Sequence, residues 1–223
     1  MGGNTGQMRR FGAIAAVLLL GGLAAGCASP KYHYVVNGAE NVSFKVPRGW
    51  STFSLPTGAD DRLSPDTPGD VKLLWSSGFD ADPNSDAEHL AAVTNYGQTI
   101  VEHAVGIANV YEIQGSYNQK ISLTEARKAP LGVDPLYVPD GVQSLVEIIK
   151  YEPIKRFRGL QGSRVQFNLR ARGDAPWSTY DMLTFFDQGN FRLYTFTVGC
   201  IGRCFQDAKS VLADVIDSWR FEQ

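Results

Sequence analysis

Residues 177–219 read WSTYDMLTFFDQGNFRLYTFTVGCIGRCFQDAKSVLADVIDSW and carry the pattern that decides the fold. Residues 177–187 and 191–199 are rich in aromatic and β-branched side chains, and they predict two strands joined by the polar turn Gln188-Gly189-Asn190. The stretch from Phe205 to Ser218 has apolar residues at helical spacing and predicts an amphipathic helix. Because so short a turn joins the two strands, we expect them to be antiparallel.

Two further strands are expected before this stretch, at residues 145–154 and 163–172, and they extend the pair to a meander of four. The last two strands are apolar on both alternating sets of positions, for example at Met182 and Phe186 in one set and at Leu183 and Phe185 in the other. A sheet that is apolar on both faces must be covered on both. The sequence therefore predicts an α+β fold with an antiparallel sheet sandwiched between helices, the final helix on one face and a helix over residues 86–104 on the other.

That second helix is expected to begin with a capping box, in which Ser85 is the N-cap and Glu88 follows three residues later. The alternative is a calcium loop, because acidic or amide side chains alternate at Asp80, Asp82, Asn84 and Asp86. A calcium loop needs Gly at its sixth position and Glu at its twelfth, where this sequence has Ser85 and Ala91. We therefore expect a helix start here and no bound metal.

A long connection, rich in proline and glycine, is expected between residues 128 and 143, after a short helix opened by a capping box from Ser122 to Glu125. Long loops inside small domains are often functional. Four apolar residues make this one a candidate contact surface: Leu131, Leu136, Tyr137 and Val138. Plain packing of these side chains is the alternative.

The first 27 residues have the layout of a secretion signal. Arg9 and Arg10 precede an apolar run that ends in small residues directly before Cys27. The run is too short for a typical transmembrane helix, which needs about 20 apolar residues. Its end resembles the lipobox of bacterial lipoproteins, which implies that Cys27 carries the lipid anchor, although Ala24 stands where Leu is usual. Cleavage without lipidation is the alternative.

The rest of the chain is expected to hold a tether at residues 28–38 and one domain at 39–223, since its length suits a single core. Export to an oxidising compartment predicts a disulfide between Cys200 and Cys204. Redox chemistry is the alternative, but the spacing is C-x-x-x-C and not C-x-x-C. The three histidines, His33, His89 and His103, are not spaced to bind zinc together with these cysteines. A formal net charge of −2 argues against nucleic-acid binding.

The chain also resembles the PsbP-like family. The resemblance rests on Val42–Trp50 (VSFKVPRGW), on Tyr194–Val198 (YTFTV) followed by the Phe205 helix, and on Ser218–Phe221 (SWRF). Together with the lipobox it points to actinobacterial lipoproteins of the LpqN type. It implies a non-enzymatic domain at the outer face of the cell membrane that binds an envelope protein partner, with no shared catalytic residues and no cofactor.

Two other functions remain open. One is a carrier of a lipid or other apolar ligand, whose pocket could be lined by Trp75, Trp177, Phe185 and Tyr194. The other is an envelope hydrolase, although the sequence has no G-x-S-x-G, phosphate-loop or H-E-x-x-H motif. A set of basic residues could face anionic lipid or an acidic partner, or could form a solvated strand face: Lys150, Lys155, Arg156, Arg158, Arg164, Arg170 and Arg172.

Overall fold

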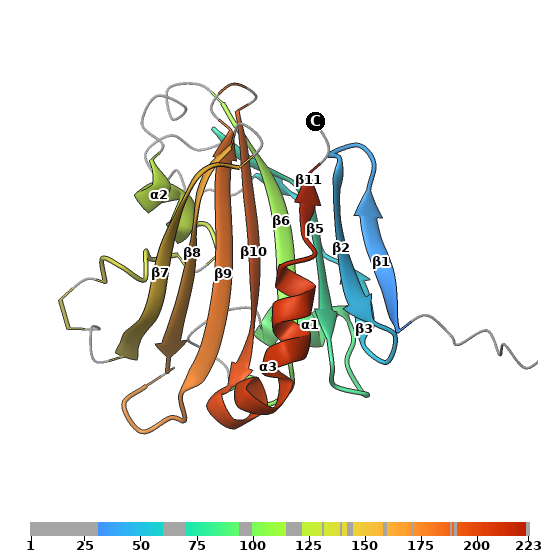
Figure 1. Ribbon diagram of the computed structural model, residues 1–223, viewed down its shortest axis with the longest axis vertical. Helices are drawn as coiled ribbons and strands as arrows, with labels where there is room; N and C mark the ends of the chain where they lie inside the picture. The colour runs from blue at the N-terminus through green and yellow to red at the C-terminus, as the bar shows by residue number, and fades with distance from the viewer. Residues whose placement is uncertain are drawn as a thin grey trace, which may run out of the picture. The chain divides into compact units, whose positions relative to one another are not determined.

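A computed structural model describes residues 31–59, 70–93, 100–114, 122–130, 132–138, 140–141, 145–157, 160–170, 172–187, 189 and 191–221. Its main element is an eight-stranded antiparallel sheet (Figure 1). The strand order is β3 (Ser51–Ser54), β5 (Val71–Asp80), β6 (Val105–Ile113), β10 (Arg192–Ile201), β9 (Ser178–Asp187), β8 (Leu160–Leu169) and β7 (Val146–Phe157), and β4 (Gly58–Ala59) also pairs with β5. The predicted α+β class and the meander β7–β8–β9–β10 are confirmed.

A second, three-stranded sheet is formed by β1 (Tyr32–Asn37), β2 (Val42–Pro47) and β11 (Arg220–Phe221), so the two ends of the domain's chain meet in it. The structure differs here from the predicted tether at 28–38, because residues 32–37 pair with β2. Tyr32 donates a hydrogen bond of 2.9 Å to Asp214 Oδ2. Because the two residues are far apart in the sequence, no local pattern predicts this contact.

Helix α3 (Gly202–Ile216) and the small sheet pack on one face of the large sheet, which we call the near face (Figure 1). Phe44 of β2 contacts Phe196 of β10, with ring centroids 4.7 Å apart. Helix α3 buries Phe205, Leu212, Val215 and Ile216, so it is amphipathic as the sequence predicts. The near face is therefore covered over β5, β6 and β10, and only in part over β9.

The opposite, far face carries α1 (Ala87–Val93) and α2 (Leu123–Lys128). Ser122 caps α2 as predicted, since its Oγ accepts a hydrogen bond from the N–H of Glu125 at 3.3 Å. The predicted cap of α1 is wrong: Asp86, and not Ser85, accepts the N–H of His89, at 2.7 Å. Residues 101–104 are not helical, so the predicted helix over 86–104 does not continue to Ala104. None of the helices in the described part of the chain is long and apolar enough to cross a bilayer.

A row of polar side chains crosses the far face. Direct strand pairing places five buried residues side by side: Ser76, Asn109, Thr195, Thr184 and Ser163. Ser76 donates to Asn109 at 2.7 Å, and Asn109 donates to Thr195 at 3.4 Å. In the described part of the chain, Thr184 Oγ1 and Ser163 Oγ have no hydrogen-bond partner. Three of the five side chains are therefore hydrogen-bonded to one another, whereas the hydroxyl groups of the other two have no partner among the described residues.

This difference predicts opposite effects of two matched substitutions. Thr195→Val removes an acceptor that Asn109 uses, and we expect the free energy of unfolding to fall by about 1 kcal/mol. Thr184→Val removes an unsatisfied buried hydroxyl, so that variant should be at least as stable as the parent protein. Urea unfolding of both variants checks this, and an equal loss in the two would show that Thr184 has a partner such as a buried water.

Candidate functional site

A groove runs along the near face where α3 and β11 leave β7, β8 and β9 uncovered. It consists of two open hollows of about 200 and 350 Å³ that meet at Glu152 and Arg164. The smaller, polar hollow is lined by Lys150, Gln166, Asp181, Phe205, Lys209, Leu212 and Ala213 as well. The larger, apolar hollow is lined by Ile154, Leu183, Phe185, Ile216, Asp217, Trp219, Arg220 and Phe221 as well. We call the two together the near-face groove.

Arg164 stands at the centre of the groove and bridges three elements. Its Nε and Nη2 donate to the two carboxylate oxygens of Asp181 on β9, at 2.8 and 2.6 Å. Its Nη1 donates to Asp217 Oδ1, just after α3, at 2.7 Å. A bidentate hydrogen bond of this kind, between Arg164 and Asp181, fixes the plane of the guanidinium group. The bridge therefore ties the end of α3 to the sheet across the floor of the groove.

Two charged groups of the groove have pKa values shifted in favour of the ionised form. Hydrogen bonds to Asp181 raise the pKa of Arg164, and the nearby charge of Asp217 adds to this effect. On β7, the hydrogen bond from Lys150 lowers the pKa of Glu152, and the two side chains are 2.6 Å apart. Lys209, on α3, is exposed. The polar hollow thus offers fixed charges of both signs to whatever enters it.

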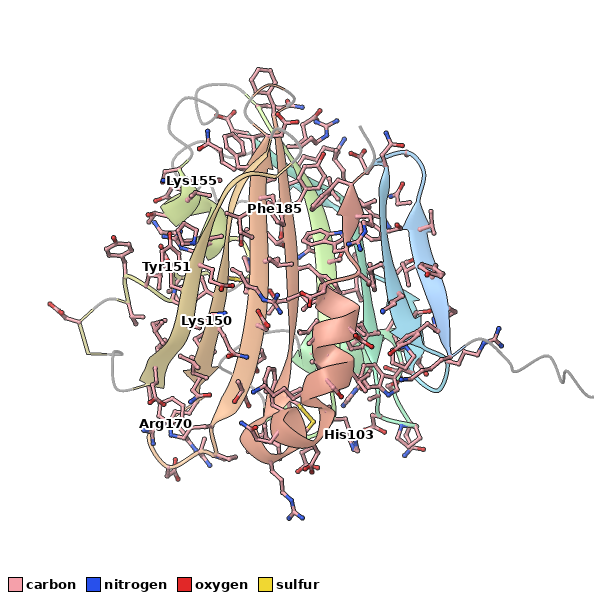
Figure 2. The ribbon with its side chains drawn as sticks, in the orientation of Figure 1. His103, Lys150, Tyr151, Lys155, Arg170 and Phe185 are labelled. Carbon is pink, nitrogen blue, oxygen red and sulfur yellow. A yellow bond between two sulfur atoms is a disulfide. The ribbon has the colours of Figure 1, made fainter. Side chains whose placement is uncertain are left out.

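Aromatic side chains form the inner wall of the apolar hollow. Phe185 contacts the edges of Trp219 and Phe221, with ring centroids 6.2 and 5.2 Å apart. The Nε1 of Trp219 is buried and has no hydrogen-bond partner in the part of the chain that the structure describes. This wall comes from β9, from β11 and from Trp219, which directly precedes β11, and Figure 2 shows Phe185 on the sheet. The apolar hollow therefore combines a hydrophobic wall with the charged centre at Arg164.

The candidate contact loop lies apart from the groove, next to α2. Arg127 of α2 bonds both carboxylate oxygens of Asp134, at 2.9 and 2.7 Å, and both residues are buried. Asp134 also accepts the N–H of Leu136 at 3.0 Å, which fixes the start of the loop. Within the loop Leu136 packs against the core, Val138 is half-buried, and Tyr137 is 71% exposed. Leu131 lies outside the described residues. The loop thus exposes the aromatic side chain of Tyr137, and the buried Arg127–Asp134 ion pair holds the start of the loop in place.

The two cysteines of the domain lie where β10 passes into α3, with their sulfur atoms 2.08 Å apart (Figure 2). Cys200 is buried in the core, and Cys204 precedes Phe205 of the polar hollow. Cys27, the predicted lipid anchor, lies outside the described residues. The two cysteines thus lie at disulfide distance from each other, close to one wall of the groove.

The basic residues from the sequence do not form one patch. Arg164 is bound to two carboxylates, Lys150 pairs with Glu152, and Arg172 pairs with Asp174 at 2.9 Å. Arg170 stacks on the ring of Trp177, at 3.9 Å from its centroid. Lys155 is exposed on β7, and the side chains of Arg156 and Arg158 lie outside the described residues. Of the four aromatic residues considered for a ligand pocket, only Phe185 lines either hollow of the groove.

The acidic segment after β5 forms turns and ties α1 to the sheet. Asp80 accepts the N–H of Asp82, and Asp82 accepts the N–H of Asn84, both at 2.8 Å. The other oxygen of the buried Asp80 is 2.7 Å from His89 Nδ1 on α1. Within the described residues, no group of three or more potential ligands is placed to hold a metal ion.

The sequence matches no protein-family model and no curated protein. Among solved structures, the chain is similar to the cyanobacterial PsbP protein CyanoP of Synechocystis, with a TM-score of 0.47 and 13% identity over 90% of this chain and 98% of that one. It is also similar to LpqN of Mycobacterium tuberculosis, described as involved in cell envelope biogenesis, with a TM-score of 0.45 and 12% identity over 86% and 91%. A third similar structure is the Ran-binding protein Mog1p of Saccharomyces cerevisiae, with a TM-score of 0.42 and 7% identity over 85% and 95%.

The centre of the groove was missed by the sequence reasoning. Arg164 lies 17 residues from Asp181 and 53 from Asp217, so no local pattern connects them. The alternation of β8 and β9 could have placed Arg164 and Asp181 on one face, but the register between the strands decides whether they meet. Asp217 joins the Arg164–Asp181 pair only because the end of α3 lies above β8.

We expect the Arg164 bridge to contribute more to stability than an exposed ion pair. Asp181→Asn keeps the shape of the side chain but removes a nearly buried charge, and it should lower the free energy of unfolding by about 1–3 kcal/mol. The matched control is Asp174→Asn, whose exposed pair with Arg172 should contribute less than about 0.5 kcal/mol. Urea unfolding of both variants measures the difference, and equal small effects would contradict a structural role for the bridge.

Proposed function

We propose that this protein is an exported lipoprotein, anchored by Cys27 to the outer face of the cell membrane, that acts as a non-enzymatic binding domain for an envelope protein. The near-face groove is the observation that carries the binding role. It is open along its length and lined by charged and apolar side chains in similar number, which suits a segment of a protein better than an enclosed apolar molecule. The contact loop, with Leu131, Leu136, Tyr137 and Val138, is a second proposed contact for the same partner.

A carrier of an apolar ligand is the second candidate, because the apolar hollow has a volume of about 350 Å³ and an aromatic wall. Small-molecule pockets are typically about 300–1,000 Å³ and bury most of the ligand. The hollow reaches that volume but stays open to solvent. The open groove therefore favours the protein partner over the carrier.

The anchor and the disulfide are supported by the sequence layout before Cys27 and by the position of Cys200 next to Cys204. We expect the intact mass of the protein from native membranes to lack residues 1–26 and to include acyl chains, because the thiol of Cys27 is acylated. We also expect no thiol that alkylating reagents can reach without reduction. Cys27→Ala should abolish incorporation of labelled fatty acid, and labelling that persists in this variant would contradict the anchor.

Photocrosslinking in native membranes tests the groove. A photoreactive amino acid at Lys209, in the polar hollow, or at Arg220, in the apolar hollow, should form adducts with one protein species. The control position is Lys72, an exposed residue on β5. Equal labelling from all three positions would contradict a binding role for the groove, whereas adducts with lipid from position 220 would support the carrier.

A further inference from the structure

The edge strands on the two sides of the large sheet differ greatly in length. One end is formed by β3 and β4, with four and two residues, and the other by β7, with twelve. In the described part of the chain β7 pairs only with β8, so its other edge has unpaired N–H and C=O groups. Proteins usually keep edge strands short or covered, because a free edge binds other strands. In the residues that the structure describes, the β7 edge is neither short nor paired with another strand.

The middle of β7, between the half-buried Val146 and Ile154, is also exposed on both of its faces. All seven residues from 147 to 153 are exposed, and among them Ile148, Ile149 and Tyr151 are 39, 49 and 42% exposed. A strand of an antiparallel sheet usually hides one face against the core. Figure 2 shows Lys150, Tyr151 and Lys155 along this strand, at the left-hand end of the sheet. Apolar side chains and free backbone groups are therefore available together.

We propose that β7 pairs antiparallel with β7 of a second copy of this chain, about a two-fold axis that passes through Tyr151. Such an axis must pass through a residue, because directly opposed residues of an antiparallel pair lie on the same face of the sheet. With the axis at Tyr151, Lys150 of each copy lies opposite Glu152 of the other. With the axis at Lys150 or Glu152, like charges would be directly opposed, which is unfavourable. Among the registers centred on Lys150, Tyr151 and Glu152, the charges on β7 therefore favour the one at Tyr151.

The same register brings apolar side chains together. Tyr151 meets its own counterpart on the far face, and aromatic cross-strand pairs are favourable. On the near face, the two Lys150–Glu152 pairs, each 2.6 Å apart within its own chain, lie next to each other with alternating sign. An interface in which the same patch serves both subunits is the commonest kind in homodimers. The self-complementary sequence around Tyr151 fits that symmetry.

Two features limit the pairing to a short segment. Pro153 has no N–H to donate, and it would lie opposite Ile149. The pairing of β7 with β8 shifts by one residue between Ile148 and Lys150, which marks a bulge. The dimer is therefore a weak one, and anchoring of both copies on one membrane would favour it.

The dimer would join the two near-face grooves. Lys150 and Glu152 line the polar hollow of each copy, and both lie on the pairing strand. The near faces of the two large sheets become continuous across the axis, because residues opposed across it share a face. A partner segment could then contact both copies. This inference goes beyond the proposed function and does not require it.

Cysteine crosslinking of the full chain in its native membranes tests the register. Tyr151→Cys places two thiols opposite each other at the axis, and mild oxidation should give a disulfide-linked dimer. Ile149→Cys is the matched control on the same exposed edge. Its two copies would be offset by four residues, about 14 Å along the strands, which is too far for a disulfide. Equal crosslinking of the two variants, or none from Tyr151→Cys, would overturn the proposal, as would a disulfide to a different protein.

Charge reversal tests the pairing without a covalent bond. Lys150→Glu or Glu152→Lys alone should weaken self-association by on the order of tenfold, because each opposes like charges at two places. When the two variants carry different tags and are expressed together, every opposed pair is again of opposite sign, and the tags should copurify. Reversal of the exposed pair Arg172 and Asp174 is the control and should change nothing. If each variant copurified with itself as well as it does with the other variant, that result would contradict the register set by Lys150 and Glu152.

Discussion

The structure depends on a central sheet that is apolar on both faces. Strands β9 and β10 bury almost every side chain, so neither face of the sheet can be left to water. The near face is covered by α3 and the three-stranded sheet, and the far face by α1 and α2. These elements do not extend over the whole width of the sheet. What they leave uncovered at β7, β8 and β9 is the origin of both the groove and the exposed edge strand.

The groove is thus a consequence of unequal coverage, and the Arg164 bridge gives it a fixed centre. A helix that covered β8 and β9 completely would need apolar residues where Arg164 and Asp181 stand. Burial of these two charges without each other would be costly, so the sequence places them together and binds Asp217 to the same guanidinium group. The result is a groove with charged groups of both signs beside an aromatic wall.

Much of the architecture could be predicted from local patterns. The last two strands, the turn between them and the stripe of α3 follow from alternation and helical spacing, and the structure has them within a few residues of their expected bounds. The errors have physical causes. Ser85 is a residue type that suits an N-cap, but so is its neighbour Asp86, which takes that position. Residues 32–37 have little apolar alternation of their own, and they form a strand because they pair with β2 four residues further on.

The fold class and the antiparallel meander could be predicted from the sequence alone, because each follows from side chains close together in the chain. Only the tertiary structure decided which strands became edges, that Arg164 meets Asp181 and Asp217, and that Lys150, Tyr151 and Glu152 stand exposed in one row. These features depend on strand register and on where a helix ends above a sheet. Strand register and the position of the helix end are set by the packing of the whole domain, so neither can be predicted from a periodic pattern within one segment.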